Sequence, residues 1–156
     1  MMGLFFNKHS NIIKEVKDFL ENDLVISKQA CGKSEKSVEN SLVRQLQEKF
    51  GEDFVHRQRS IGENFKMKCD VDLFSGGCGI ELKLASSLES KADEFHRAIG
   101  QIACYAHEHY ITSGIILLVV GKEPEMSEKI DELRTIVNHF PRVHFVYKQA
   151  HNKIQK

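Results

Sequence analysis

The sequence lacks three features that would place a protein in a broad class at once: a long apolar run, paired cysteines and a net charge. No stretch reaches the eighteen apolar residues of a membrane span, and the longest apolar segment, 114–121, has the length of a buried strand. The amino terminus also lacks the apolar stretch and small-residue cleavage site of a signal peptide. We therefore expect a cytoplasmic protein without membrane contact.

Acidic and basic residues balance at 22 each, so no overall positive field attracts a polyanion. Any contact with nucleic acid has to come from a local patch. The four cysteines contain no Cys-x-x-Cys pair, and His107 and His109 lack the four-residue spacing of a helical zinc pair. We expect free thiols in a reducing compartment and no zinc site.

What the sequence does contain is enough apolar chain for one domain over residues 1–156. The helical spacing of apolar residues predicts helices near 10–24, 38–50, 88–110 and 124–140. Alternating or continuous apolar residues predict strands near 54–60, 65–74, 78–84, 115–120 and 143–147. The expected fold class is α/β, a mixed β-sheet flanked by helices in the order ααβββαβαβ, with its core at about 34–147 and helix 10–24 appended.

Two of these predicted strands carry acidic residues and a lysine between their apolar residues. Asp70 and Asp72 alternate with apolar residues on one strand, and Glu81 and Lys83 do so on the next. If the turn centres on the Gly-Gly pair between the strands, Asp72 lies opposite Glu81, and Asp70 lies opposite Lys83. Two carboxylates beside an ammonium group suit a hard divalent cation. The alternative is a solvated sheet face with cross-strand ion pairs.

The order α-β-β-β-α-β, with Asp on the second strand and Glu-x-Lys on the third, resembles the PD-(D/E)xK nuclease superfamily over about 34–120. In the helix that follows, Gln101 and Tyr105 form a Gln-x-x-x-Tyr sequence that is similar to the motif of the RecB-like branch. No proline precedes Asp70 or Asp72, and the double aspartate leaves open which of them corresponds to the family's acid. The resemblance implies a restriction-endonuclease-like fold.

The resemblance also implies a metal-dependent nuclease that hydrolyses phosphodiester bonds, with DNA as the expected substrate and RNA as an alternative. It implies Mg²⁺, with Mn²⁺ as a substitute, held by Asp72, Glu81 and the backbone carbonyl of Leu82. Asp70 is the rival to Asp72. Lys83 is implied beside the attacking water, as an electrostatic stabiliser or a general base.

A further metal ligand is implied on the helix before the sheet. Glu39 stands three residues before an apolar position, as the family's helical glutamate does, and Glu35 is a weaker candidate in the same region. Taken alone, Glu39 is more typical of a solvated helix face, and only the surrounding pattern makes the two interpretations equal.

Basic and polar residues beside these motifs are candidates for nucleic-acid binding. Arg97, Gln101 and Tyr105 are four residues apart and are predicted to share one helix face. The resemblance implies that this stripe contacts a phosphate backbone or positions the catalytic lysine; the alternative is a solvated face with a tyrosine at its edge. Lys66 and Lys68 are further candidates, with a charged edge strand that resists aggregation as the alternative.

Two functions from different classes follow. The first is the metal-dependent nuclease, and the second is a catalytically silent module of the same fold that binds nucleic acid or a partner protein. The complete set of acid, acid, lysine and glutamine favours the nuclease. The neutral net charge favours the module, or a nuclease that depends on a partner protein for targeting. The sequence also leaves open whether the chain forms a homodimer.

Overall fold

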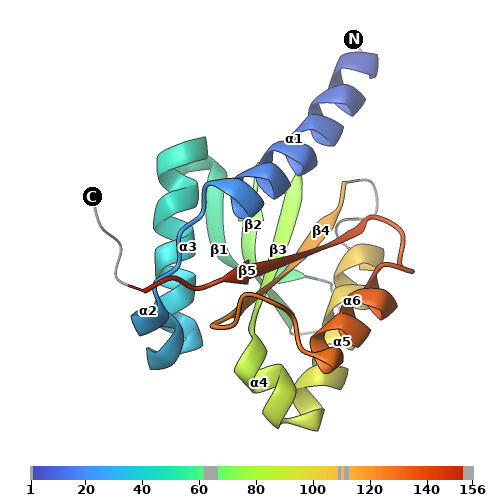
Figure 1. The fold of residues 1–156 in the computed structure, drawn as a ribbon. Coiled ribbons are helices and arrows are strands. Elements are labelled where there is room, and N and C mark those ends of the chain that lie inside the picture. The colour runs from blue at the N-terminus through green and yellow to red at the C-terminus, as the bar shows by residue number, and fades with distance from the viewer. Residues whose placement is uncertain (1, 62–66, 109, 111–112, 153–156) are drawn as a thin grey trace.

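The computed structural model describes residues 2–61, 67–108, 110 and 113–152, and side chains from residue 12 onward. The described residues form a five-stranded mixed sheet with helices on both faces (Figure 1), which confirms the predicted fold class. The helices are α1 (Met2–Asn22), α2 (Lys28–Lys33), α3 (Glu35–Phe50), α4 (Ala85–Ser90), α5 (Ala92–Glu108), α6 (Glu128–Val137) and the short 3₁₀ helix η1 (Glu52–Phe54). The strands are β1 (Val55–Ile61), β2 (Met67–Leu73), β3 (Cys78–Leu84), β4 (Ile115–Gly121) and β5 (Val143–Gln149).

The strands lie side by side in the order β1-β2-β3-β4-β5. β2 runs antiparallel to both β1 and β3, whereas β3, β4 and β5 run parallel to one another. Every residue of β4 is buried, as its continuous apolar sequence predicted, because helices cover both faces of the sheet beside it.

Two hydrophobic clusters lie on opposite faces of the sheet. α1 and α3 pack on one face, where Leu20 and Leu42 belong to the same hydrophobic cluster as Leu118 of β4. α4, α5 and α6 cover the other face, where Ile102 meets Leu117. Leu117 and Leu118 point to opposite faces because successive strand residues alternate, and β4 therefore contributes to both clusters.

The helices differ from their predicted bounds in several places. α1 begins at Met2 rather than near residue 10. The expected helix at 88–110 is divided into α4 and α5, with Lys91 as the residue after α4. The last helix begins only after Ser127, whose side chain accepts a hydrogen bond from the amide of Ile130. The short helix α2 was not predicted; Ser27 caps it in the same way. In the described part of the chain, no helix combines the length and apolarity needed to cross a bilayer.

The register between β2 and β3 also differs from the prediction. Asp72 pairs with Gly79, and Leu73 pairs with Cys78, so the hairpin is shifted by two residues from the predicted pairing of Asp72 with Glu81. The turn therefore centres on Ser75 and Gly76 rather than on the Gly-Gly pair. This prediction was wrong because it assumed that the two glycines would occupy the centre of the turn.

Local packing explains why the turn takes this less common form. Phe74 and Ser75 both have positive φ values, 56° and 50°, which are unusual for residues with a Cβ atom. The Phe74 ring stacks on Phe54 with centroids 5.2 Å apart and meets the edge of Phe50 at 6.0 Å. These aromatic contacts hold Phe74 where the left-handed backbone places it.

Candidate active site

The site is formed where β2 departs from a regular strand. Cys69 packs in the cluster that contains α5, whereas Val71 packs in the cluster that contains α3. Residues two apart in a regular strand share one face, so the pleat is interrupted at Asp70 between them. Opposite Asp70 on β1 stands Gln58, whose φ is 52°, and the pairing of β1 with β2 skips these two residues. The interruption turns the Asp70 side chain toward β3.

Asp70 is held between the two strands by hydrogen bonds. Its Oδ2 accepts the backbone N–H of Leu82 at 2.8 Å, and its Oδ1 accepts the side-chain amide of Gln58 at 3.3 Å. Burial raises the pKa of the Asp70 carboxyl, and the bond from Leu82 offsets part of that rise. A carboxylate thus takes the position of a backbone acceptor at this point of the sheet.

Glu81 and Lys83 lie beside Asp70 on β3. They share one face of the strand and are 2% and 6% exposed. The Lys83 ammonium lies 3.5 Å from Glu81 and 3.7 Å from Glu94 of α5. Burial and the nearby Asp70 carboxylate raise the pKa of Glu81 to about 8, and the Lys83 ammonium offsets only part of this rise. Desolvation and repulsion between acids therefore dominate over the ion pair.

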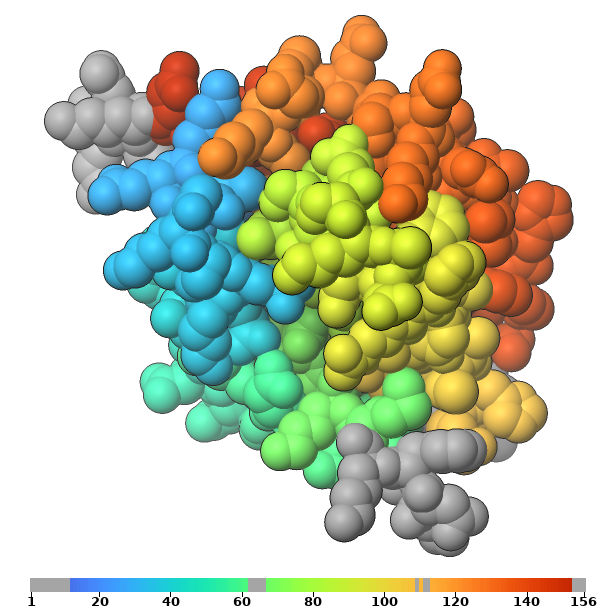
Figure 2. All heavy atoms as spheres, turned by 90° about the horizontal axis from the view of Figure 1, so that it is seen from below, coloured from blue at the N-terminus to red at the C-terminus, as the bar shows by residue number. Residues whose placement is uncertain are grey.

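These side chains open into one pocket of about 660 Å³ between α3 and α5. Figure 2 looks onto this region, where the green β2–β3 segment lies at the bottom of a hollow between the blue α2–α3 segment and the yellow α5 segment. The acidic side chains that line the pocket are Glu35, Asp70, Glu81 and Glu94. The basic side chains are Lys68, Lys83 and Arg97.

Two buried oxygen atoms in this pocket, Oε1 of Glu81 and Oε1 of Gln101, have no hydrogen-bond partner within the described residues. A buried polar atom without a partner is costly, and both oxygens can accept a hydrogen bond or ligate a cation. Carboxylate and amide oxygens are ligands that Mg²⁺ takes. The residues therefore fit a hard divalent cation.

The described residues contain no group of three or more His, Cys, Asp or Glu side chains that could hold a metal ion. An ion bound by Asp70 and Glu81 would thus complete its coordination with other oxygens. Mg²⁺ commonly keeps several waters and takes substrate phosphate oxygens, so a site with two carboxylates is sufficient for it. The carbonyl of Leu82 stays a predicted ligand.

Asp72 does not lie in the pocket, which corrects its assignment as the principal metal ligand. It is fully buried and accepts the hydroxyl of Tyr110 at 2.6 Å and the N–H of Gly76 at 3.1 Å. Its Oδ2 also lies 3.4 Å from the Arg59 guanidinium. Asp70, the rival candidate, occupies the position beside Glu81 instead, because the shifted register changes which aspartate adjoins that residue.

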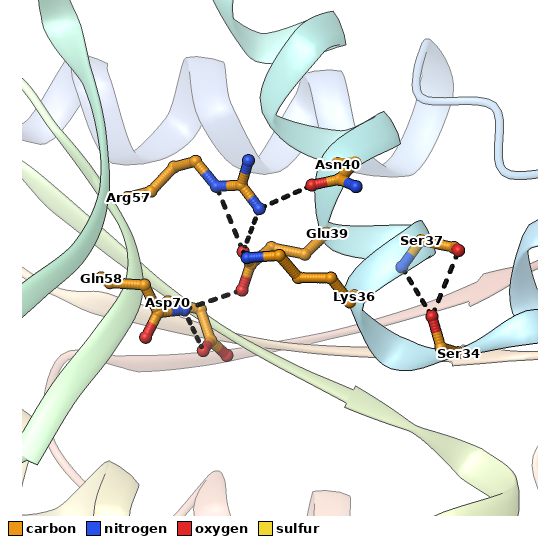
Figure 3. Close-up of polar contacts among 8 residues, drawn as sticks. All are labelled: Ser34, Lys36, Ser37, Glu39, Asn40, Arg57, Gln58 and Asp70. Carbon is orange, nitrogen blue, oxygen red and sulfur yellow. Dashed lines mark hydrogen bonds and ion pairs between the residues drawn. The ribbon is translucent and has the colours of Figure 1, made fainter.

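Glu39 lies near the site but is saturated by other side chains (Figure 3). Its Oε2 accepts two donors from Arg57, with Nε at 3.2 Å, and its Oε1 accepts the amide of Gln58 at 2.8 Å. The predicted role of Glu39 as a metal ligand is therefore revised: it contacts Asp70 only through Gln58. Glu35, the weaker candidate, lines the pocket, and burial raises the pKa of its carboxyl.

The predicted stripe on α5 is divided between the pocket and the core. Arg97 and Gln101 line the pocket, as does Lys68 of β2. Tyr105 is completely buried, and its hydroxyl donates to the carbonyl of Lys68 at 2.9 Å. Tyr105 is thereby corrected from a nucleic-acid contact to a residue that positions β2. Lys66 lies outside the described residues.

Sequence reasoning missed two residues of the site. Glu94 precedes Arg97 by three residues and Gln101 by seven, so helical spacing alone could have placed it on their face. Gln58 carries no comparable signal, because its place in the site depends on a positive φ in the middle of a strand.

Searches of this chain against models of protein families, against curated proteins and against solved structures found no match. The resemblance to the PD-(D/E)xK superfamily therefore stays a prediction from the motifs.

Proposed function

We propose that this chain is a metal-dependent nuclease of the PD-(D/E)xK type, which hydrolyses phosphodiester bonds in DNA. One observation carries the proposal: Asp70, Glu81 and Lys83 meet in one pocket, and a buried oxygen of Glu81 has no partner among the described residues. Lys83 pairs with the other oxygen of Glu81 and leaves this one without an acceptor role in the described part of the chain, which is costly for a buried polar atom in a purely structural site.

Asp70, Glu81 and Gln101 are the residues that would hold the divalent ion. When bound, Mg²⁺ neutralises phosphate charge and lowers the pKa of a water ligand. The pocket needs such a cation, because its four acidic side chains outnumber its three basic ones and would repel a polyanion.

The basic residues divide into an inner and an outer group. Lys83 is almost completely buried beside the acids, where its ammonium can stabilise the negative charge on the phosphoryl oxygens in the transition state. Lys68 and Arg97 are exposed at the pocket, where they can bind the flanking phosphates. Contacts of this kind do not read base sequence, so the proposal carries no sequence preference.

A cleavage assay tests the proposal directly. The protein is incubated with single-stranded, duplex and branched DNA in the presence of Mg²⁺, Mn²⁺ or EDTA. We expect metal-dependent cleavage that Asp70→Asn and Lys83→Met each abolish. Lys148→Met is the matched control for the lysine, because Lys148 is also buried but donates to a carbonyl of α1, away from the pocket.

The silent module is the second candidate, and one observation favours it. The Glu39 carboxylate is hydrogen-bonded to Arg57, and the described residues contain no group of three side chains that could hold a metal ion. Both features are expected if metal binding had been lost. Calorimetry with Mn²⁺ separates the two functions. Absence of both cleavage and Mn²⁺ binding would refute the nuclease and leave the module.

A further inference from the structure

We infer that Gln58 is a positioning residue, which holds the Asp70 carboxylate in the orientation that the metal site requires. The inference rests on the proposed function and assigns a role to a residue that no motif contains. Gln58 does not have to touch substrate or metal. It acts through Asp70.

The backbone of Gln58 is the first observation. Its φ of 52° lies in the left-handed region, in the middle of β1, where a side chain with a Cβ is strained. Strain of this kind persists only where the surrounding structure imposes it, and it clusters at functional sites. In this protein the strained residue stands directly opposite Asp70, where the pleat of β2 is also interrupted.

The side chain of Gln58 is the second observation. Its Nε2 donates to Oε1 of Glu39 at 2.8 Å and to Oδ1 of Asp70 at 3.3 Å (Figure 3). Both partners are carboxylates, which accept but do not donate when ionised. A primary amide has two N–H groups, so one Gln58 nitrogen can serve both acids. No other residue type of this size offers two donors without adding a charge.

The third observation is that Gln58 is itself anchored. Glu39 is buried on α3 and accepts Arg57 as well as Gln58, so the glutamate is fixed from two sides. The contacts form a chain from Arg57 through Glu39 and Gln58 to Asp70. Asp70 is then fixed from one side by the Gln58 amide and from the other by the N–H of Leu82.

This arrangement gives Asp70 a defined orientation before any ion binds. One oxygen faces Leu82 in the sheet and the other faces Gln58, with Glu81 on the adjoining strand. Groups that orient a metal ligand in this way commonly change metal affinity by about 10- to 100-fold when they are removed. We expect Gln58 to belong to this class.

Two substitutions separate the amide from the strained backbone. Gln58→Met keeps the length and the Cβ but removes both donors. Gln58→Gly removes the donors and relieves the strain, so its melting temperature should be unchanged or raised. Arg142→Gly is the matched control, because Arg142 also has a positive φ, 60°, and does not line the pocket.

Hydrogen exchange at the amide of Leu82 reports the position of Asp70 without metal, since that N–H donates to Asp70. In metal-free protein we expect both Gln58 variants to exchange this amide at least about fivefold faster, relative to the amide of Leu118 in β4. Calorimetry should show the Mn²⁺ dissociation constant rising about tenfold in both. Arg142→Gly should change neither quantity.

Each outcome decides the inference. Exchange at Leu82 that stays at the wild-type rate in both Gln58 variants overturns it, whatever the Mn²⁺ affinity. Faster exchange in a protein that neither binds Mn²⁺ nor cleaves DNA keeps the positioning of Asp70 but refutes the proposed nuclease, and the role in metal binding falls with it. If Gln58→Met does not fold, Gln58→Gly provides the same two measurements.

Discussion

Replacing Glu81 with glutamine should stabilise the metal-free protein at alkaline pH. Glu81 is 2% exposed, and burial together with Asp70 raises its pKa to about 8 from 4.5. The folded protein therefore binds a proton that the unfolded chain releases between pH 4.5 and 8. Stability must fall as the pH rises through that window, and the loss is complete above pH 8. Glutamine has no charge to desolvate and escapes this loss.

The size of the effect follows from the pKa. A rise from 4.5 to about 8 corresponds to an upper limit of about 5 kcal/mol, at 1.36 kcal/mol for each pKa unit. Burial of the new amide opposes the gain by about 1–3 kcal/mol. Lys83 keeps a partner, because Glu94 lies 3.7 Å from it. We expect a net gain of about 2 kcal/mol at pH 9, or roughly 4–8 °C in melting temperature. At pH 5 we expect a loss of up to about 2 kcal/mol, because the Glu81 carboxyl is then largely protonated in the folded protein and the cost of the buried amide is not offset.

Urea unfolding followed by circular dichroism at pH 5 and pH 9, in EDTA, measures this difference. Glu132→Gln on the exposed face of α6 is the control and should have no effect at either pH. Mg²⁺ should stabilise the wild type and not Glu81→Gln, by about 1.4 kcal/mol at ten times the dissociation constant. A loss of stability in Glu81→Gln at both pH values would refute the reasoning and make Glu81 a structural partner of Lys83.

Three further predictions concern neighbouring residues. Asp72→Asn should lower the free energy of unfolding in urea by about 1–3 kcal/mol. The reason is that the Asp72 oxygen that accepts the Tyr110 hydroxyl and the N–H of Gly76 becomes a poorer acceptor, and unchanged stability would contradict this buried network. Gln101→Ala should lower the cleavage rate at least about tenfold, or 1.4 kcal/mol in transition-state stabilisation, with an unchanged melting temperature; wild-type cleavage would remove Gln101 from the site. Gly79→Ala should cost about 1–3 kcal/mol in thermal unfolding, because its Cβ would lie 2.5 Å from the Tyr110 ring. Gly100→Ala has open space around its Cβ and should gain up to about 1 kcal/mol from helix propensity, and equal effects of the two changes would contradict this account.

Sequence periodicity determined the strands and much of the site. Alternation placed Glu81 and Lys83 together on one face of β3, and the continuous apolar sequence of β4 indicated a buried strand. Helical spacing placed Arg97 and Gln101 on the same side of α5, where both line the pocket. Each of these features depends only on the backbone period of one element, which a sequence records directly.

The tertiary structure decided which aspartate belongs to the site. A shift of two residues in a hairpin leaves every side chain on the same face, so the hydrophobic pattern cannot distinguish Asp70 from Asp72 as the neighbour of Glu81. The register was set by contacts between distant segments: the stacking of Phe74 on Phe54, and the Tyr110 ring over Gly79, where a Cβ has no room.

The same limit applies to Gln58 and Tyr105. Nothing in the order of residues indicates that Gln58 adopts a positive φ in a strand, because the preference of glutamine is the opposite and only the surroundings impose it. Tyr105 shares a helix face with Gln101, yet its ring is buried in the core and its hydroxyl donates to the carbonyl of Lys68. A sequence fixes the period of each element, whereas the distance between elements depends on how all the side chains pack at once.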